Sequence, residues 1–504
     1  MKCKVVVGIM LCFLRYPIDG VSQDTTRLSL LFLGDIMQHD SQIKAAYNDA
    51  TTGNTYDYTD CFKFVKPYIE SVDVAIGNLE CTLAGPPYKG YPQFSAPDEL
   101  ALALKDMGMD VLVTANNHSV DRGKKGIDRT IEMLDSLKII HTGTFKDTVD
   151  RMNDYPLFVQ KNGFMFALLN YTYGTNGITV TKPNVVNRLD TAIMKRDILK
   201  AKAASPDFII VFTHWGQEYQ SQPSIVQKRI TEFCFRNGVQ LVIGSHPHVL
   251  QPMEWRKERN QLVTYSLGNF VSGQRDRYKD GGAMVQVNFT KVTKDSVATT
   301  VLDSAGYVLE WVYRTTDDQR DYYVLPVPTF ETDTTGFIKD ETSKLAFKTF
   351  AEDSRKLLKK YNLNISEINQ QPAKKNGGQS SVSYGMTSEE NLRWMAMVKA
   401  SDKKSKLDLV KSRLIEKRPS LDPADKLDTP MLVIDGIPLE DNIDKRKREF
   451  LTRELTEEIV DIQVLEKEPE GLYVNKRFTG VVLLTIIDKK ISKEFRKLNS
   501  ANGQ

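Results

Sequence analysis

Residues 30–35 read LLFLGD, an unbroken apolar run that ends at an aspartate. Four further runs of the same kind follow: VAIGNLE at 74–80, VLVTANNH at 111–118, IIVFTH at 209–214 and LVIGSHPH at 241–248. Continuous runs of Val, Ile and Leu are typical of strands that are buried on both faces, as in α/β sheets. The five runs therefore predict an α/β fold whose central strands are covered on both sides.

Each of the five runs ends in side chains that can bind a metal ion. In chain order these side chains are Asp35 with His39, Glu80, Asn117 with His118, His214, and His246 with His248. A core histidine or a turn aspartate explains any one run, but it does not explain why five of the six histidines follow such runs. Because α/β sheets place their sites where strands end, the pattern predicts one metal centre at a sheet edge.

The donor types limit the chemistry of this predicted centre. Carboxylate, imidazole and amide groups without a thiolate suit zinc, manganese, iron or cobalt, and they do not choose between them. Two such ions bridged by a carboxylate such as Glu80 would acidify a water between them. His118, with Asp121 three residues later, is placed to be a general acid that a carboxylate orients. His141 in KIIHTGT also follows a short apolar run, and both a substrate contact and a structural role are compatible with it.

Length and composition indicate a globular chain with more than one unit. The 504 residues correspond to about three units of roughly 150 residues each, although one α/β domain can be larger. Hydrophobic residues make up 41% and charged residues 26%, as in ordinary globular proteins. With 68 basic and 65 acidic residues, the net charge of +3 gives no overall attraction to nucleic acid or membranes.

The N-terminus predicts export. A start with two lysines precedes an apolar stretch at 5–14, which is too short to span a bilayer. The small residues within 20–22 offer a cleavage site. We expect residues 1–22 to be a signal peptide, which leaves a periplasmic or secreted protein without a transmembrane span; an uncleaved amphipathic start is the alternative. The residue before Cys12 is Leu11, whereas a small residue precedes the cysteine of a lipidation site.

Helical periodicity alternates with the strands between residues 28 and 330. The helices predicted in this region span 58–69, 97–107, 123–137, 188–203 and 221–237. After residue 261 the sequences LVTYSLGNF and GGAMVQVNF indicate sheet with hairpins, and a helix at 342–361 is expected to pack back on the domain. The order favours a sheet sandwich with helices outside, over residues 24–368.

A second unit is predicted beyond this domain. Residues 369–387 contain NQQPAKKNGGQSSVSY, whose composition is typical of a flexible linker. Residues 388–427 form a basic helical segment, for which a solvated helix face is the default explanation and an anionic polymer or lipid surface the alternative. Residues 428–492, with PMLVIDGIPL, VDIQVLEKE and GVVLLTII, predict a small α/β module.

Six motifs follow one another between residues 28 and 365: GDIM with His39, GNLE, ANNHSVDRG, HWG, GSHPH and YSLGNF. In this order they resemble the bacterial capsule-synthesis (CapA, poly-gamma-glutamate synthesis) family of the calcineurin-like metallophosphoesterase superfamily. The resemblance implies a four-layer αββα sandwich with a two-metal site. It also implies that Glu80 bridges the ions, that Asn117 binds metal, that His118 faces the leaving group, and that His246 and His248 close the ligand set.

The first motif departs from the superfamily pattern. That pattern is D-x-H, whereas here Asp35 stands alone and the nearest histidine is His39. If a helix begins at Asp35, His39 returns to the same face one turn later. The resemblance also implies that Tyr173 and Asn176 in YTYGTNG, and Asn269 in YSLGNF, contact substrate in the cleft.

A weaker resemblance covers residues 429–487. The sequences VIDGIPL, DIQVLEKEP and GLYVNKRFTGVVLLTI resemble the plug domain of TonB-dependent outer-membrane receptors. No receptor barrel follows within the 504 residues. The resemblance implies a free-standing periplasmic module that binds an envelope protein; an unrelated small α/β fold is the alternative.

Two functions are compatible with these observations. The first is an exported metal-dependent hydrolase that acts on a phosphoester in the synthesis of a capsule or polyglutamate-type surface polymer, and the complete ligand set with His118 favours it. The second is a non-catalytic component that binds polymer or partner proteins during envelope polymer assembly or export. The appended C-terminal module is the feature that supports the second function.

Overall fold

The computed structural model describes residues 24–47, 56–294, 297–317, 321–372, 395–415, 431–438, 445–465 and 481–500. The predicted signal peptide at 1–22 and most of the predicted linker at 369–387 lie outside these residues. Within the described ranges, no helix combines the length and the apolar character needed to cross a membrane.

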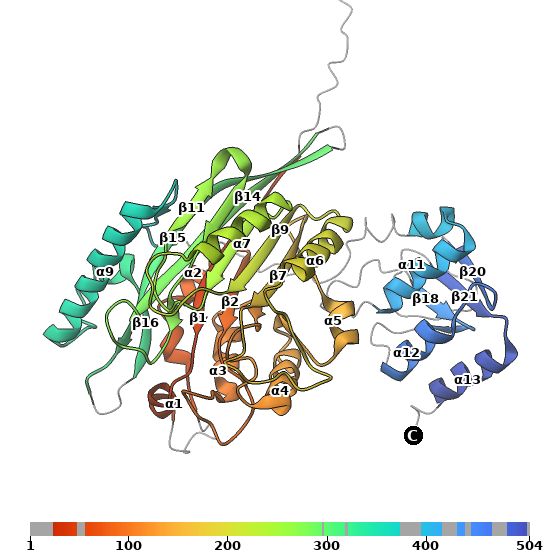
Figure 1. The fold of residues 1–504 in the computed structure, drawn as a ribbon, viewed down its shortest axis with the longest axis horizontal. Helices are drawn as coiled ribbons and strands as arrows, with labels where there is room; N and C mark the ends of the chain where they lie inside the picture. Colours follow the sequence, from red (N-terminus) through yellow and green to blue (C-terminus); the bar gives the residue numbers. More distant parts are fainter. Residues whose placement is uncertain are drawn as a thin grey trace, which may run out of the picture.

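A nine-stranded sheet forms one half of the body (Figure 1). Its strands are β1 (Asp24–Ile36), β2 (Val74–Leu79), β3 (Val111–Val113), β4 (Ile140–Thr142), β13 (Asn269–Val271), β14 (Gly281–Lys294), β15 (Val297–Arg314), β16 (Tyr322–Pro326) and β17 (Ser366–Glu367). Their order is β16-β15-β14-β1-β2-β3-β4, with β13 beside β1 and β17 beside β15. Strands β1 to β4 run parallel, whereas β14, β15 and β16 pair antiparallel.

A six-stranded sheet forms the other half. Its strands are β6 (Leu157–Lys161), β7 (Phe164–Thr172), β9 (Phe208–His214), β10 (Leu241–Ser245), β11 (Met253–Arg256) and β12 (Gln261–Thr264). Their order is β11-β12-β10-β9-β7-β6, and β7, β9, β10 and β12 are parallel. A separate pair joins β5 (Thr144–Phe145) to β8 (Val185–Val186). All five apolar runs quoted above form strands, as predicted.

The helices of the body include those predicted from the sequence and further short ones that were not predicted. They are α1 (Asp40–Ala46), η1 (Thr59–Phe62), α2 (Lys66–Glu70), α3 (Asp98–Asp106), α4 (Gly123–Ser136), α5 (Thr148–Asp154), α6 (Thr191–Ala203), α7 (Ile225–Arg236), η2 (Lys257–Arg259), α8 (Val327–Phe330) and α9 (Glu341–Tyr361). The helix predicted at 58–69 is two short helices, because Pro67 fits only the first turn of a helix.

Side-chain alternation along the strands divides the body into four layers. In β1, Leu30 and Phe32 face a core between the two sheets, which Ile210 of β9 enters from the opposite side. The intervening residues Leu31 and Leu33 face a second core, formed with α2, α3 and α4. A third core joins β7, β9 and β10 to α6 and α7, which cover the outer face of the six-stranded sheet (Figure 1). The order helix, sheet, sheet, helix is the αββα sandwich predicted from the sequence.

Helix α9 closes one end of the core between the sheets. Its side chains Phe347, Phe350 and Leu358 are buried in that core. The expectation that the helix predicted at 342–361 packs back on the domain is therefore confirmed.

The C-terminal unit has a core of its own. Its elements are α11 (Lys403–Ile415), β18 (Met431–Ile434), β19 (Ile437–Pro438), α12 (Lys445–Glu454), β20 (Val460–Leu465), β21 (Val481–Ile486) and α13 (Lys489–Ser500), with strand order β19-β18-β21-β20. Val398 and Leu407 are buried together with Ile434 and Phe495. The described parts on both sides of the predicted boundary between residues 427 and 428 therefore share one core, while the boundary itself stays a prediction.

Candidate metal centre

Strand register brings the polar residues of the nine-stranded sheet to one level. Asp35, near the end of β1, pairs with Asn78 of β2 and with Asn269 of β13. The Asn78 side chain donates to Asp35 Oδ1 at 2.9 Å. The Asp35 N–H donates to the carbonyl oxygen of Gly268. Gly34 permits this close approach of the two segments, because a Cβ at residue 34 would lie 2.2 Å from that oxygen.

The six-stranded sheet contributes histidines at the same edge. His214 ends β9 and pairs with Ser245 of β10, whose Oγ lies 3.0 Å from His214 Nδ1. The chain then leaves β10 through His246 and His248, whose φ angles of 98° and 57° are unusual for residues other than glycine. The His246 N–H donates to Asp35 Oδ2 at 3.2 Å. Strained backbone of this kind is concentrated at functional sites.

Two groups of buried side chains have the spacing of metal ligands. Glu80, His246 and His248 form one group, and Asp35, Glu80 and His214 form the other; within each group the ligand atoms lie within 4.8 Å of one another. Glu80 belongs to both groups. Its Oε1 lies 3.3 Å from His214 Nε2 and 3.8 Å from His248 Nε2. The arrangement therefore has a carboxylate between two sets of imidazoles.

Burial disfavours the charged forms of Glu80, His214 and His246. Burial, followed by the charge of Asp35, raises the pKa of Glu80 well above its usual value. Burial, followed by His246 and His248, lowers the pKa of His214 well below its usual value. Burial also lowers the pKa of His246 to about 3. The imidazoles of His214 and His246 are thus held neutral, which is the form that binds metal ions.

The donor atoms fit a divalent cation. Glu80 Oε1 and His246 Nδ1 are buried and have no hydrogen-bond partner among the residues that the structure describes. Burying such atoms unpaired is costly, and a cation between them would satisfy both. Carboxylate and imidazole donors match zinc, manganese, iron and cobalt.

His39 lies outside both ligand groups. The helix expected to begin at Asp35 begins only after His39, because β1 continues to Ile36 and pairs there with β13, with a register shift between Asp35 and Ile36. His39 Nδ1 accepts the backbone N–H of Gly273 at 3.1 Å. Burial lowers the pKa of His39 to about 4. The argument that placed His39 one helical turn from Asp35 is therefore wrong.

Asn117 and His118 follow β3 and reach the cluster from the loop. Asn117 Oδ1 lies 2.9 Å from His214 Nε2. His118 Nδ1 donates to Asp121 Oδ2 at 2.7 Å, and the same carboxylate oxygen accepts the Phe94 N–H at 2.8 Å. A carboxylate that holds Nδ1 fixes the ring and leaves Nε2 to face a reactant. The geometry is that of an oriented acid or base.

Three of the residues predicted to contact substrate lie beside the cluster. The separations are 4.5 Å between the ring centroids of Tyr173 and His246, 3.5 Å between Asn176 Nδ2 and His118 Nδ1, and 3.1 Å between Asn269 Oδ1 and His248 Nδ1. The structure therefore brings together residues from distant parts of the sequence at one edge of the two sheets.

His141 is placed elsewhere. It lies on β4, and its Nε2 is 3.0 Å from Asp135 Oδ1 on α4. This contact is compatible with the structural role, and both roles that the sequence left open for His141 stay predictions.

Two asparagines at the site were not predicted. Asn78 contacts both sheets, because its Nδ2 donates to Asp35 and lies 3.3 Å from His214 Nδ1. Asn116 Nδ2 donates to Asn78 Oδ1 at 3.2 Å. An asparagine inside a fully buried strand such as VAIGNL is unusual, and this signal was available in the sequence.

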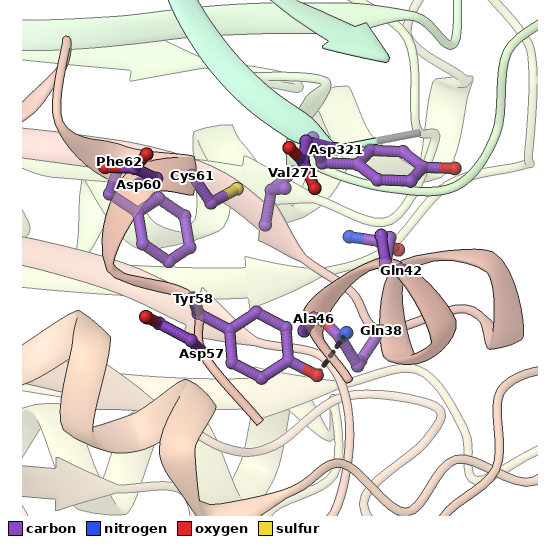
Figure 2. Close-up of a pocket in the computed structure, with 12 residues that line it drawn as sticks. Gln38, Gln42, Ala46, Asp57, Tyr58, Asp60, Cys61, Phe62, Val271 and Asp321 are labelled. Carbon is purple, nitrogen blue, oxygen red and sulfur yellow. Dashed lines mark hydrogen bonds between the residues drawn. The ribbon is translucent and has the colours of Figure 1, made fainter. Parts of the chain in front are cut away.

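A cavity of about 50 Å³ lies between α1 and η1 (Figure 2). Asp57, Asp60 and Asp321 line it without any lysine or arginine, and Gln38 Nε2 donates to Tyr58 Oη at 2.7 Å in its wall. None of the residues of the two ligand groups lines this cavity. It is therefore separate from the candidate metal centre.

Comparison with known proteins gives the family. Residues 29–274 match the protein-family model described as bacterial capsule synthesis protein PGA_cap. The chain is 31% identical over 278 residues to the capsule biosynthesis protein CapA of Bacillus anthracis, a match that covers 52% of this chain and 64% of that protein. It is 30% identical over 274 residues to the PGA biosynthesis protein CapA of Bacillus subtilis, over 52% and 68% of the two chains.

The matches do not extend over the whole of these relatives, since the chain spans less than two thirds of the Bacillus anthracis protein. Among solved structures, the calcineurin-like phosphoesterase YfkN from Bacillus subtilis aligns with a TM-score of 0.34 and 12% identity, over 66% of this chain and 99% of that one. On the sequence matches, the chain belongs to the bacterial capsule synthesis family PGA_cap.

Proposed function

We propose that this chain is an exported, metal-dependent hydrolase of the phosphoesterase type that acts in the synthesis of a capsule or polyglutamate-type surface polymer. The observation that supports it most is the position of Glu80, which is shared by two buried ligand groups, each of which combines residues of both sheets. A shared carboxylate of this kind is what a two-ion hydrolytic site requires. The names of the two Bacillus relatives support the assignment to polymer synthesis.

The chain offers donors for two divalent ions of zinc, manganese, iron or cobalt. The residues that would hold them are Asp35, Glu80, Asn117, His214, His246 and His248. Such ions, when bound, would acidify an attacking water and draw charge from the phosphoryl oxygens. The strand ends fix these donors in place before any ligand arrives, which lowers the cost of organising the site.

His118 would move the proton in this reaction. The Asp121 carboxylate at Nδ1 stabilises the doubly protonated ring and directs Nε2 toward the leaving oxygen. Both side chains are buried, so bulk water competes little for their hydrogen bond. Tyr173, Asn176 and Asn269 would orient the substrate.

A second candidate is a non-catalytic component that binds polymer or a partner protein. The separate core of the C-terminal unit favours it, because an appended unit offers a surface for an envelope partner. The resemblance of residues 429–487 to a receptor plug domain remains a prediction.

Metal analysis and turnover of the full-length chain separate the two functions. The hydrolase should contain transition metal after purification without chelator and should cleave phosphodiesters, and Glu80→Gln should lose metal and activity together. Full metal occupancy without turnover of any phosphoester would support the binding component.

A further inference from the structure

Two exposed tyrosine rings lie at the edge of the ligand cluster. Tyr173 is 43% exposed and Tyr219 is 47% exposed. The ring centroid of Tyr173 lies 4.5 Å from that of His246, and the centroid of Tyr219 lies 6.2 Å from that of His248. Exposed aromatic side chains next to converging polar groups are typical of ligand sites.

The backbone ties both tyrosines to the segments that carry the histidines. The Tyr173 N–H donates to the carbonyl oxygen of His214 at 2.9 Å, and the Tyr219 N–H donates to that of Pro247 at 2.8 Å. Tyr219 also has a φ of 64°, which is unfavourable for a bulky side chain and persists only where its surroundings enforce it. The backbone at both tyrosines is therefore fixed relative to the site before a ligand binds, which favours affinity.

Polar groups surround the exposed rings. Gln274 Nε2 donates to Tyr219 Oη at 3.4 Å. Glu218 precedes Tyr219 and is exposed, as is Asn176 beside His118. Lys279 Nζ lies 4.7 Å from the centroid of the Tyr219 ring, but it is paired with Asp276 at 2.7 Å. The surface thus combines aromatic faces with hydrogen-bonding amides and a carboxylate.

We infer that Tyr173 and Tyr219 form a platform for a sugar ring, so that the phosphoester bound at this site carries a carbohydrate. This inference rests on the proposed phosphoesterase function. The C–H groups of a sugar face are weakly positive and lie well against the negative face of an aromatic ring. Sugar hydroxyls need both donors and acceptors, which Asn176 and Glu218 supply.

Other ligand classes fit this surface less well. A plain acyl chain would form no hydrogen bonds with the amides and the carboxylate of this surface. A polyglutamate chain, one of the two polymer types in the proposed function, would meet the negative charge of Glu218, while the nearby Lys279 is already paired. The surface therefore favours a carbohydrate capsule over polyglutamate. The neutral, hydroxylated ring of a sugar uses both the aromatic faces and the polar groups.

Titration calorimetry of the full-length chain in manganese-containing buffer tests the platform. Glucose 1-phosphate and ethyl phosphate share the phosphoryl group, and only the first has a sugar ring. We expect glucose 1-phosphate to bind about three- to tenfold more tightly than ethyl phosphate, because its sugar ring gains the stacking energy of the aromatic rings. Tyr219→Ala should abolish most of this preference, whereas Tyr219→Phe, which keeps the ring, should retain it.

The variants are matched for backbone strain and exposure. Phenylalanine and alanine both lack glycine's tolerance of positive φ, so Tyr219→Phe and Tyr219→Ala share that cost. Tyr361 at the end of α9 is 40% exposed, and Tyr361→Ala should keep the preference of the wild type.

Each outcome is decisive. Equal binding of both phosphates by the wild type overturns the platform and leaves the phosphoester site intact. A preference for phenyl phosphate over glucose 1-phosphate overturns it as well, in favour of an aromatic ligand. Binding of methyl glucoside that is lost in Tyr219→Ala, without binding of either phosphate, supports the platform and refutes the phosphoesterase function. Absence of binding by all these compounds overturns both.

Discussion

Replacing Asp121 by asparagine tests whether His118 acts as an oriented acid. The bond between His118 Nδ1 and Asp121 Oδ2 is 2.7 Å long, and the two side chains are only 4% and 1% exposed. A hydrogen bond to a charged partner contributes about 1.5–3 kcal/mol, and burial protects it from screening by salt. If the bond is fully effective only when the ring is charged, Asp121→Asn should lower turnover roughly ten- to 150-fold.

The assay is hydrolysis of an alkyl phosphodiester at matched metal content, with the pH profile recorded. Asparagine retains an oxygen that can accept the Phe94 N–H, so the fold should change little. Asp135→Asn is the matched control, because it alters the His141–Asp135 pair of 3.0 Å outside the cluster and should leave turnover unchanged. Wild-type turnover and an unaltered pH profile in Asp121→Asn would refute the oriented-acid argument.

Three further results are expected. His118→Asn should keep its metal yet lose about 10²–10⁴-fold in turnover of alkyl esters, and less with acidic leaving groups; equal loss on both substrates would contradict the acid role. Burial raises the pKa of Glu310 well above 4.5, so the folded state keeps a proton that the unfolded state releases, and the free energy of unfolding should fall as pH rises above about 4.5. In Glu310→Gln this part of the fall should be missing when the free energy of unfolding is measured with urea at several pH values. An unchanged pH dependence in the variant would contradict the prediction. A fragment of residues 24–368 contains the hydrophobic cores of the body and should fold alone with the metal of the full chain; aggregation or loss of metal would show that the boundary is misplaced.

The sequence predicted the strands well because burial on both faces leaves a simple signal. Runs such as VAIGNL are continuous in apolar residues, and Val74 to Leu79 is buried throughout. Their carboxyl ends meet at one sheet edge, so residues that follow them, such as Glu80 and His214, could be expected near one another.

The remaining features depend on contacts between distant segments. His39 was misplaced because β1 continues through pairing with β13, more than 230 residues away, which local periodicity does not reveal. Tyr219 reaches the site through one backbone bond to Pro247 and an unusual φ, and neither has a sequence signal. The shared core of the C-terminal unit depends in the same way on Val398 and Leu407 packing against strands later in the chain.

The central claim is that the buried donors around Glu80 hold transition-metal ions. Elemental analysis of the full-length chain, purified without chelator and then reconstituted, tests it most directly. We expect two ions per chain, one for each ligand group, and loss of metal in the double variant His246→Ala/His248→Ala with only a moderate fall in Tm. A wild-type chain that contains no transition metal after reconstitution, or a double variant that retains both ions, would contradict the claim.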